Sequence, residues 1–368
     1  MLTDAGILLP TDSHYDTPRL LDAHQPPPDE PPEVTQAVAA VKKLGDTELF
    51  DADGPLWYRG NVSCGELIEE SRLLAALEAI GADRLVVGHT PTPGRRVLQR
   101  FDGRLIEIDT GMLSDYYRGS GNALIFDGEK LAVLNQGGEM TIPADHPRNV
   151  GTRPGSMSAD DLQKLLEVGD IVSRQVDASG TTVVKVSDGK RMVSAIFSKR
   201  QGRSFYPGVA AYRLDRLLDL EMVPVTAIRK VGGVDGSLQF VTNRYLDEEQ
   251  RAASGSGGGA PCSIPDQWEA MFVFDALIYN QGRSKRRMLY DSATWRLLLV
   301  GHDRAFASRK GRPTHLKSIA LQLTSGWETA LAGLDDTLLS ETFSEVLDKR
   351  RIKALSQRRD ELLASLQN

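Results

Sequence analysis

The spacing of hydrophobic residues along the chain predicts helices interspersed with short strands. Between residues 71 and 81, Leu74, Leu77 and Ile80 fall on one helical face, with Ser71 placed to begin the helix and Gly81 to end it. The same pattern predicts helices over residues 34–43, 209–220 and 268–279, and a charged helical region from residue 325 onward.

Short apolar runs predict strands in both halves of the chain. The Asp102-Gly103 and Asp127-Gly128 pairs lie between such runs, which is typical of hairpin turns. The predicted strands cover residues 84–87, 96–101, 105–108, 123–126, 130–135, 172–176, 181–186, 192–197, 223–230, 237–243, 288–290 and 295–300. We therefore expect a fold of the α/β and α+β classes, with a mixed sheet and helices in the first half.

Composition indicates where the chain divides. Residues 25–33 (QPPPDEPPE) carry five prolines and three acidic residues, so residues 1–35 are expected to form a flexible tail. A Gly/Pro-rich, charged stretch predicts a linker at 138–159, between a first domain at 36–137 and a second at 160–368. The run SGSGGGA predicts a flexible insertion at 250–262.

Charge and cysteine content narrow the function classes. The chain of 368 residues has 44 basic and 50 acidic side chains, a net charge of −6, which argues against a nucleic-acid-binding protein. Two cysteines, Cys64 and Cys262, are too few for a disulfide scaffold and suit a reducing compartment. The sequence has no signal-peptide pattern and no apolar run near the ~20 residues that span a bilayer, so we expect a cytoplasmic protein that does not contact membranes.

A first candidate site combines Trp57-Tyr58-Arg59 with Gly88-His89-Thr90. His89 lies just past the C-terminal end of a predicted buried strand, where ligating and catalytic side chains of α/β proteins commonly lie. Imidazole is a common metal ligand, and an arginine fork matches the oxygens of a phosphate.

Together with Ile108-Asp109-Thr110-Gly111-Met112, these motifs resemble, over residues 50–135, the C-terminal half of calcineurin-like metallophosphoesterases. The resemblance is to the phosphoprotein phosphatase group that includes Shewanella-like phosphatases. It implies that His89 binds a metal and that Arg59 holds the substrate phosphate. Divalent ions (Mn, Fe, Zn or Mg) would be the cofactor if the site is complete. The family's N-terminal motifs GDxH, GDxxDRG and GNHE do not occur in this chain, so the resemblance covers a partial phosphoesterase sandwich.

A second candidate site lies in the stretches VAAYRLDRL, FDALIYNQGRSKRRML and LVGHDRAF, at residues 209–217, 274–289 and 299–306. Over residues 170–350 their order and spacing resemble the atypical, two-lobed kinase-like fold of HipA-like and phosphoinositide-kinase-like proteins. That family's loop reads roughly N-x-D-R-x-x-x-N-x-L. Here Gly282 stands at the catalytic Asp, Arg287 at the magnesium-binding Asn, and Gly301 at the second magnesium-binding Asp. Because glycine cannot accept a proton and arginine cannot bind magnesium, the resemblance implies a pseudokinase.

Several side chains of this domain keep other possibilities open. Lys199, one position out of register, could grip a phosphate, and Asp303 or Asp275 could restore metal binding. The alternative is that Asp275 is structural on its helix and that Asp303 is a surface or loop partner of an arginine. The cluster that includes Arg283 and Arg287 could bind an anion or nucleotide without Mg²⁺, or could be a solvated basic loop.

Three functions are therefore open. The first is a metal-dependent phosphoester hydrolase, acting on a phosphorylated substrate, with a kinase-like regulatory domain. The second is a non-catalytic protein whose kinase-like domain binds an anion, a nucleotide or a protein partner. The third is an active atypical kinase that uses Lys199 and Asp303. Metal content separates the first from the second, and magnesium-dependent ATP binding separates the third.

Overall fold

The computed structural model describes residues 2–12, 17–48, 54, 56–128, 130–147, 157–177 and 180–366. The chain is a mixed α/β protein of the α+β type, with several separate sheets. Its contacts divide it into two compact units, Met1–Tyr58 and Arg59–Asn368. The finer predicted boundaries, at residues 36, 138 and 160, stay predictions.

The first unit is helical. It contains α1 (Thr17–Ala23) and α2 (Pro32–Gly45), which pack against each other. Pro32 occupies the first turn of α2, where its missing N–H has no helical partner to lose. The predicted tail at 1–35 thus contains one helix and the start of another, with Leu21 and Val34 buried.

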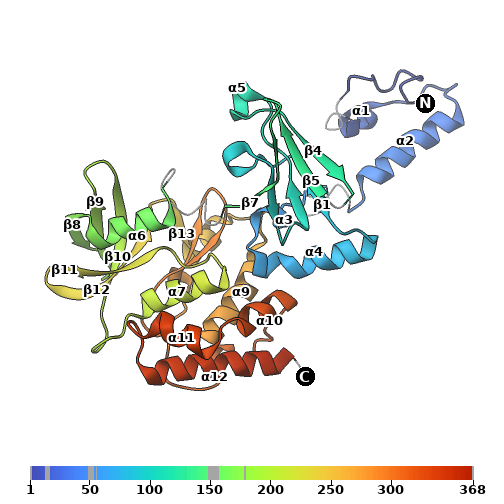
Figure 1. Ribbon diagram of the computed structural model, residues 1–368. Coiled ribbons are helices and arrows are strands. Elements are labelled where there is room, and N and C mark those ends of the chain that lie inside the picture. The colour runs from blue at the N-terminus through green and yellow to red at the C-terminus, as the bar shows by residue number, and fades with distance from the viewer. Residues whose placement is uncertain are drawn as a thin grey trace. The chain divides into compact units, whose positions relative to one another are not determined.

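The second unit carries the remaining elements that the described residues form (Figure 1). Its helices are α3 (Gly60–Ser63), α4 (Glu66–Ile80), α5 (Ser114–Tyr117), α6 (Ala159–Val168), α7 (Pro207–Leu218), α8 (Glu248–Ser254), α9 (Ile264–Leu277), α10 (Ser325–Ala332), α11 (Asp336–Phe343) and α12 (Lys349–Leu366). Its strands are β1 (Leu85–Val87), β2 (Leu98–Arg100), β3 (Leu105–Glu107), β4 (Asn122–Asp127), β5 (Lys130–Asn135), β6 (Met140–Thr141), β7 (Ala144–Asp145), β8 (Asp170–Val176), β9 (Thr182–Ser187), β10 (Met192–Lys199), β11 (Thr226–Val231), β12 (Val234–Val241), β13 (Tyr245–Asp247), β14 (Met288–Asp291) and β15 (Leu297–Leu299).

Two sheets occupy the first part of this unit. One has the order β1-β3-β2-β7 and is mixed, because β1 is parallel to β3 while β2 and β3 form an antiparallel hairpin. The other has the order β4-β5-β6. The two share a small apolar cluster in which Val97, Ile106 and Val133 are buried. The predicted hairpins at Asp102-Gly103 and Asp127-Gly128 are both present.

A five-stranded antiparallel sheet, order β11-β12-β10-β9-β8, dominates the second part. Alternate residues of β10 (Val193, Ala195 and Phe197) are buried, as a period of two requires when one face meets the core. Helix α6 packs against this sheet, and its N-cap Ser158 accepts a hydrogen bond from the Asp161 N–H. A smaller sheet, β13-β14-β15, follows.

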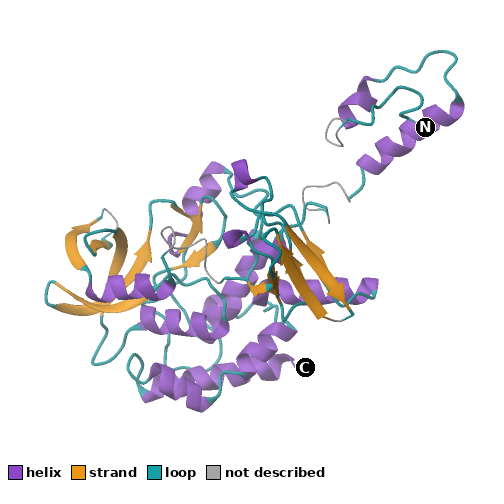
Figure 2. Cartoon of the chain, turned by 45° about the horizontal axis from the view of Figure 1, so that its top comes forward, coloured by secondary structure: helices purple, strands orange, loops and turns teal. Residues whose placement is uncertain are grey.

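Helices α7, α9, α10, α11 and α12 form the remaining layer (Figures 1 and 2). They share one hydrophobic core with the five-stranded sheet, which also includes Leu67 of α4. Farther along α4, Leu73 and Leu77 are buried against Phe101 and Leu105 of the β2–β3 hairpin. Helix α4 therefore packs on both parts of the unit.

Several sequence expectations need correction. Helix α4 begins at Glu66, so Ser71 lies inside it and is not its N-cap, whereas Gly81 ends it with φ 64° as expected. The predicted linker contains β6 and β7, and β7 pairs with β2. Part of the predicted insertion at 250–262 is helix α8. The helix begins with a capping box between Asp247 and Gln250.

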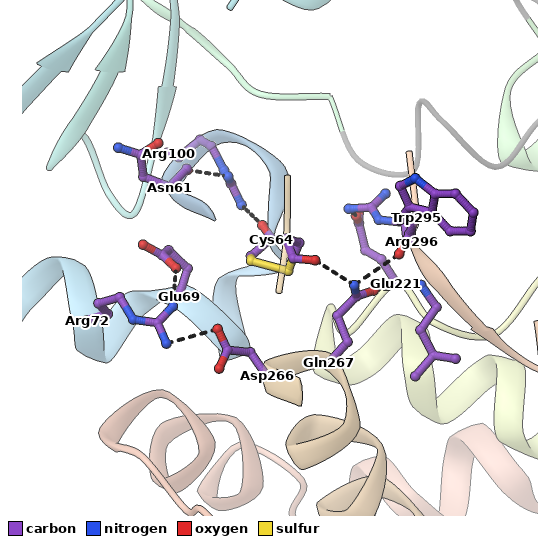
Figure 3. The surroundings of a disulfide bond; sticks show 12 residues. Asn61, Cys64, Glu69, Arg72, Arg100, Glu221, Asp266, Gln267, Trp295 and Arg296 are labelled. Carbon is purple, nitrogen blue, oxygen red and sulfur yellow. Dashed lines mark hydrogen bonds and ion pairs between the residues drawn. A yellow bond between two sulfur atoms is a disulfide. The ribbon is translucent and has the colours of Figure 1, made fainter. Parts of the chain in front are cut away.

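The two cysteines also behave differently from the sequence expectation. Cys64 and Cys262, 198 residues apart, form a disulfide with a Cα–Cα distance of 4.9 Å (Figure 3). Beside it, Arg72 of α4 pairs with Asp266 of α9 at 2.9 Å. The Nε2 of Gln267 donates to the Cys262 carbonyl. The bond thus joins the start of α4 to the start of α9.

Candidate functional site

The loop at residues 280–289, part of the second candidate site of the sequence, follows the end of α9. Asp275, in the last turn of α9, is fully buried, and its Oδ1 accepts a hydrogen bond from the Asn280 side chain. Asn280 Oδ1 in turn accepts from the Gly282 N–H at 2.9 Å. Because buried polar groups need partners, this chain of bonds fixes the backbone that enters the loop.

The buried side chain of Arg283 holds the loop in place through hydrogen bonds. Its Nε and Nη2 donate to both oxygens of Asp275, at 2.8 and 2.9 Å. Its Nη1 donates to the carbonyls of Arg287 and Val300, and its Nη2 also lies 3.4 Å from Nε2 of His302. All five N–H groups of this guanidinium therefore point at protein acceptors. This changes the prediction for Arg283, because the contacts give it a positioning role and leave no donor for an anion.

Arg287 lies where the kinase-like pattern would bind magnesium. Its Nη1 donates to the carbonyl oxygens of Gly301 at 2.9 Å and Gly282 at 3.3 Å. A Cβ on Gly282 would lie 2.7 Å from Arg287 Nη1, and a Cβ on Gly301 would lie 2.7 Å from Arg287 Cδ. The two glycines make room for the arginine, so Gly282, Arg287 and Gly301 form one linked arrangement.

The charges around this loop do not fit a divalent cation. Arg283 and Arg287 both contribute positive charge where metal ligands would be needed. Burial, together with these two guanidiniums, lowers the pKa of His302 well below its usual value, so its ring is neutral. Asp303 Oδ2 lies 3.5 Å from Arg287 Nη2, which makes Asp303 a partner of the arginine. Magnesium therefore does not fit the residues present.

Lys199 belongs to the same end of the domain. It is the last residue of β10 and is exposed. Two residues farther, Gln201 Nε2 donates to the Asp303 carbonyl at 2.8 Å, which ties the end of β10 to the loop. Arg287 and Asp303 thus lie together, and Gln201 connects Asp303 to the end of β10 that carries Lys199, while Arg283 is buried.

The first candidate site has a different setting. Arg59 directly precedes α3, and His89 follows the carboxyl end of β1 with a φ of 61° and an exposed side chain. Across the described residues, no three His, Cys, Asp or Glu side chains are grouped in a way that could hold a metal ion.

Sequence reasoning missed Asp215. It lies on α7, fully buried, and its Oδ1 accepts the N–H groups of Met222 and Val223. Burial raises its pKa to about 7. A single acidic residue in an amphipathic helix carries no signal of burial, because helical spacing places it beside the polar face.

No family model matches the chain. One relative, an uncharacterized protein from Schizosaccharomyces pombe, is 40% identical over 72 residues. The match covers 19% of this chain and 20% of the relative, so the chain spans about one fifth of the length of that protein. None of the described helices is long and apolar enough to cross a membrane.

Proposed function

We propose that the chain is a non-catalytic binding protein whose kinase-like part holds a phosphate-bearing ligand, such as a nucleotide, without Mg²⁺. The observation that carries this proposal is the guanidinium of Arg287 between Gly282 and Gly301. A fixed cation there replaces the charge that magnesium supplies in a kinase.

The geometry leaves Arg287 able to meet a ligand. Its side chain is 33% exposed, in contrast to 6% for Arg283. Its Nη1 is engaged by two carbonyls, whereas Nη2 has a carboxylate only at 3.5 Å. Guanidinium N–H groups that point outward match phosphate oxygens well, and the exposed Lys199 adds a second positive charge.

Calorimetric titration of the purified chain with ATP tests the proposal, once with MgCl₂ and once with EDTA. We expect equal affinity in both buffers and no phosphoryl transfer. Arg287→Met should weaken binding by about tenfold or more, since it removes a charge-assisted hydrogen bond. Arg286→Met is the matched control, because Arg286 is an exposed neighbour that pairs with Glu249.

Binding that requires magnesium, followed by transfer to a hydroxyl, would favour the active kinase instead. Equal binding by the Arg287→Met variant would remove the role given to Arg287.

The hydrolase is the second candidate, and the exposed position of His89 at the end of β1 favours it. Bound metal and hydrolysis of an aryl phosphate in Mn²⁺, both lost in His89→Ala, would support it.

A further inference from the structure

A second site lies beside the disulfide, away from the kinase-like loop. It is a pocket of about 770 Å³, within the size range of small-molecule sites, and Cys64 and Cys262 form part of its wall. Neither Arg59 nor His89 is among the residues that line it.

The lining of this pocket is strongly acidic. Six carboxylates face only two guanidiniums there, those of Arg100 and Arg296. The carboxylates belong to Glu66, Asp102, Glu107, Asp145, Asp219 and Glu221. An excess of negative charge in a concave site attracts cations.

Both guanidiniums are already engaged by the protein. Arg100 donates to the carbonyls of Asn61 and Cys64, at 2.5 and 2.6 Å. Arg296 pairs with Glu221 at 3.0 Å. Figure 3 shows Arg100 on one side of the disulfide, and Glu221 and Arg296 on the other. Arg100 also interacts electrostatically with Glu107, but its hydrogen bonds go to the two backbone carbonyls.

Glu107 supplies an independent sign of a ligand. It ends β3 and is 3% exposed. Its Oε2 lies 3.1 Å from His146 Nδ1, whereas its Oε1 is buried with no hydrogen-bond partner in the described part of the chain. A buried carboxylate oxygen without a donor is costly, and an ammonium group would supply one.

We propose that this pocket binds a small organic cation of the aliphatic amine class, with Glu107 Oε1 accepting from its ammonium group. A metal ion is a poorer fit, because the described residues group no three potential metal-ligating side chains. The site is separate from the anion site of the proposed function, so either can hold without the other.

Calorimetric titration of the full chain with putrescine tests the inference, and 1,4-butanediol is the uncharged compound with the same carbon skeleton. We expect saturable binding of putrescine and none of the diol. Glu107→Gln keeps the shape of the side chain but removes its charge, so it should weaken binding by about tenfold or more. Glu345→Gln should leave binding unchanged, since Glu345 is 72% exposed and does not line the pocket.

A second variant keeps the test valid if Glu107→Gln does not fold. Asp145→Asn alters an exposed carboxylate of the pocket whose Oδ1 accepts from Gln99, and it should weaken putrescine binding as well. Three outcomes would overturn the inference: no binding of putrescine, equal binding of the diol, or displacement of putrescine by inorganic phosphate at constant ionic strength.

Discussion

Asp215 couples the stability of the protein to pH. Its pKa is 3.8 in an exposed setting and is raised to about 7 in the folded chain, mainly by burial. Between about pH 4 and 7 the folded state therefore binds more protons than the unfolded state. The stabilisation is fully present below that window and is lost as the pH rises through it.

Asp215→Asn should remove this contribution, because an amide oxygen can still accept the Met222 and Val223 N–H groups but cannot ionise. Between pH 5 and pH 8, the unfolding free energy of the natural chain should fall by about 2 kcal/mol more than that of the variant. Urea unfolding at the two pH values measures this difference. Asp127→Asn, at an exposed position, is the control. Parallel pH profiles for Asp215→Asn and the natural chain would show that Asp215 does not titrate as described.

The arrangement around Arg287 shows what single residues reveal before a structure is known. The glycines and the arginine at these three positions are visible in the sequence, and they are the basis of the pseudokinase hypothesis, which stays a prediction. That the arginine fills the space above both glycines could not be predicted, since it depends on the packing of two separate loops. Arg283 and Arg287 look alike in the sequence, yet one is buried against Asp275 and the other is partly exposed.

Elements were predictable where local pattern and turn chemistry agree. β5 covers residues 130–135 as expected, because a Gly-containing turn and a short apolar run both mark it. Boundaries were missed where tertiary packing decides them. Helix α4 starts at Glu66 because Leu67 packs into the main core, and its N-cap, Gly65, has no side chain that could mark it.

A buried arginine attaches helix α12 to neighbouring segments of the fold. Arg358, 1% exposed, donates from Nε to the Leu277 carbonyl and from Nη1 to the carbonyls of Ala307 and Arg309. Burial lowers its pKa to about 10, so it stays charged at neutral pH. These bonds connect α12 to the end of α9 and to the segment after residue 306.

Arg358→Met keeps much of the side-chain volume but leaves three carbonyls without their donor. It should lower the free energy of unfolding by about 3 kcal/mol. Arg350→Met, on an exposed face of the same helix, should change it by less than about 0.5 kcal/mol. Guanidinium chloride unfolding followed by circular dichroism compares the two variants. Similar losses for both would mean that the buried contacts of Arg358 do not hold the helix.

At the scale of the whole second unit, the disulfide connects segments that lie far apart in the sequence. Two cysteines at a separation of 198 residues give no spacing signal, so the pairing could not be read from the sequence. Other contacts cross the same junction, including the Arg72–Asp266 pair and the packing of Leu67 in the main core. The unit should therefore stay folded without the bond.

The bond should nevertheless stabilise the protein, because it closes a very long loop in the unfolded chain. Loop-closure entropy sets its contribution at about 5 kcal/mol as an upper value. Dithiothreitol should lower the unfolding midpoint of the natural chain to that of the Cys64→Ser, Cys262→Ser double variant, and it should not affect the variant itself. If the native chain instead exposes two alkylatable thiols after non-reducing unfolding, and its midpoint is insensitive to dithiothreitol, the cysteines are free. That result would mean that Cys64 and Cys262 are reduced, as their low number suggests. The pocket beside them would then be held by the Arg72–Asp266 pair and by the packing of Leu67 in the main core.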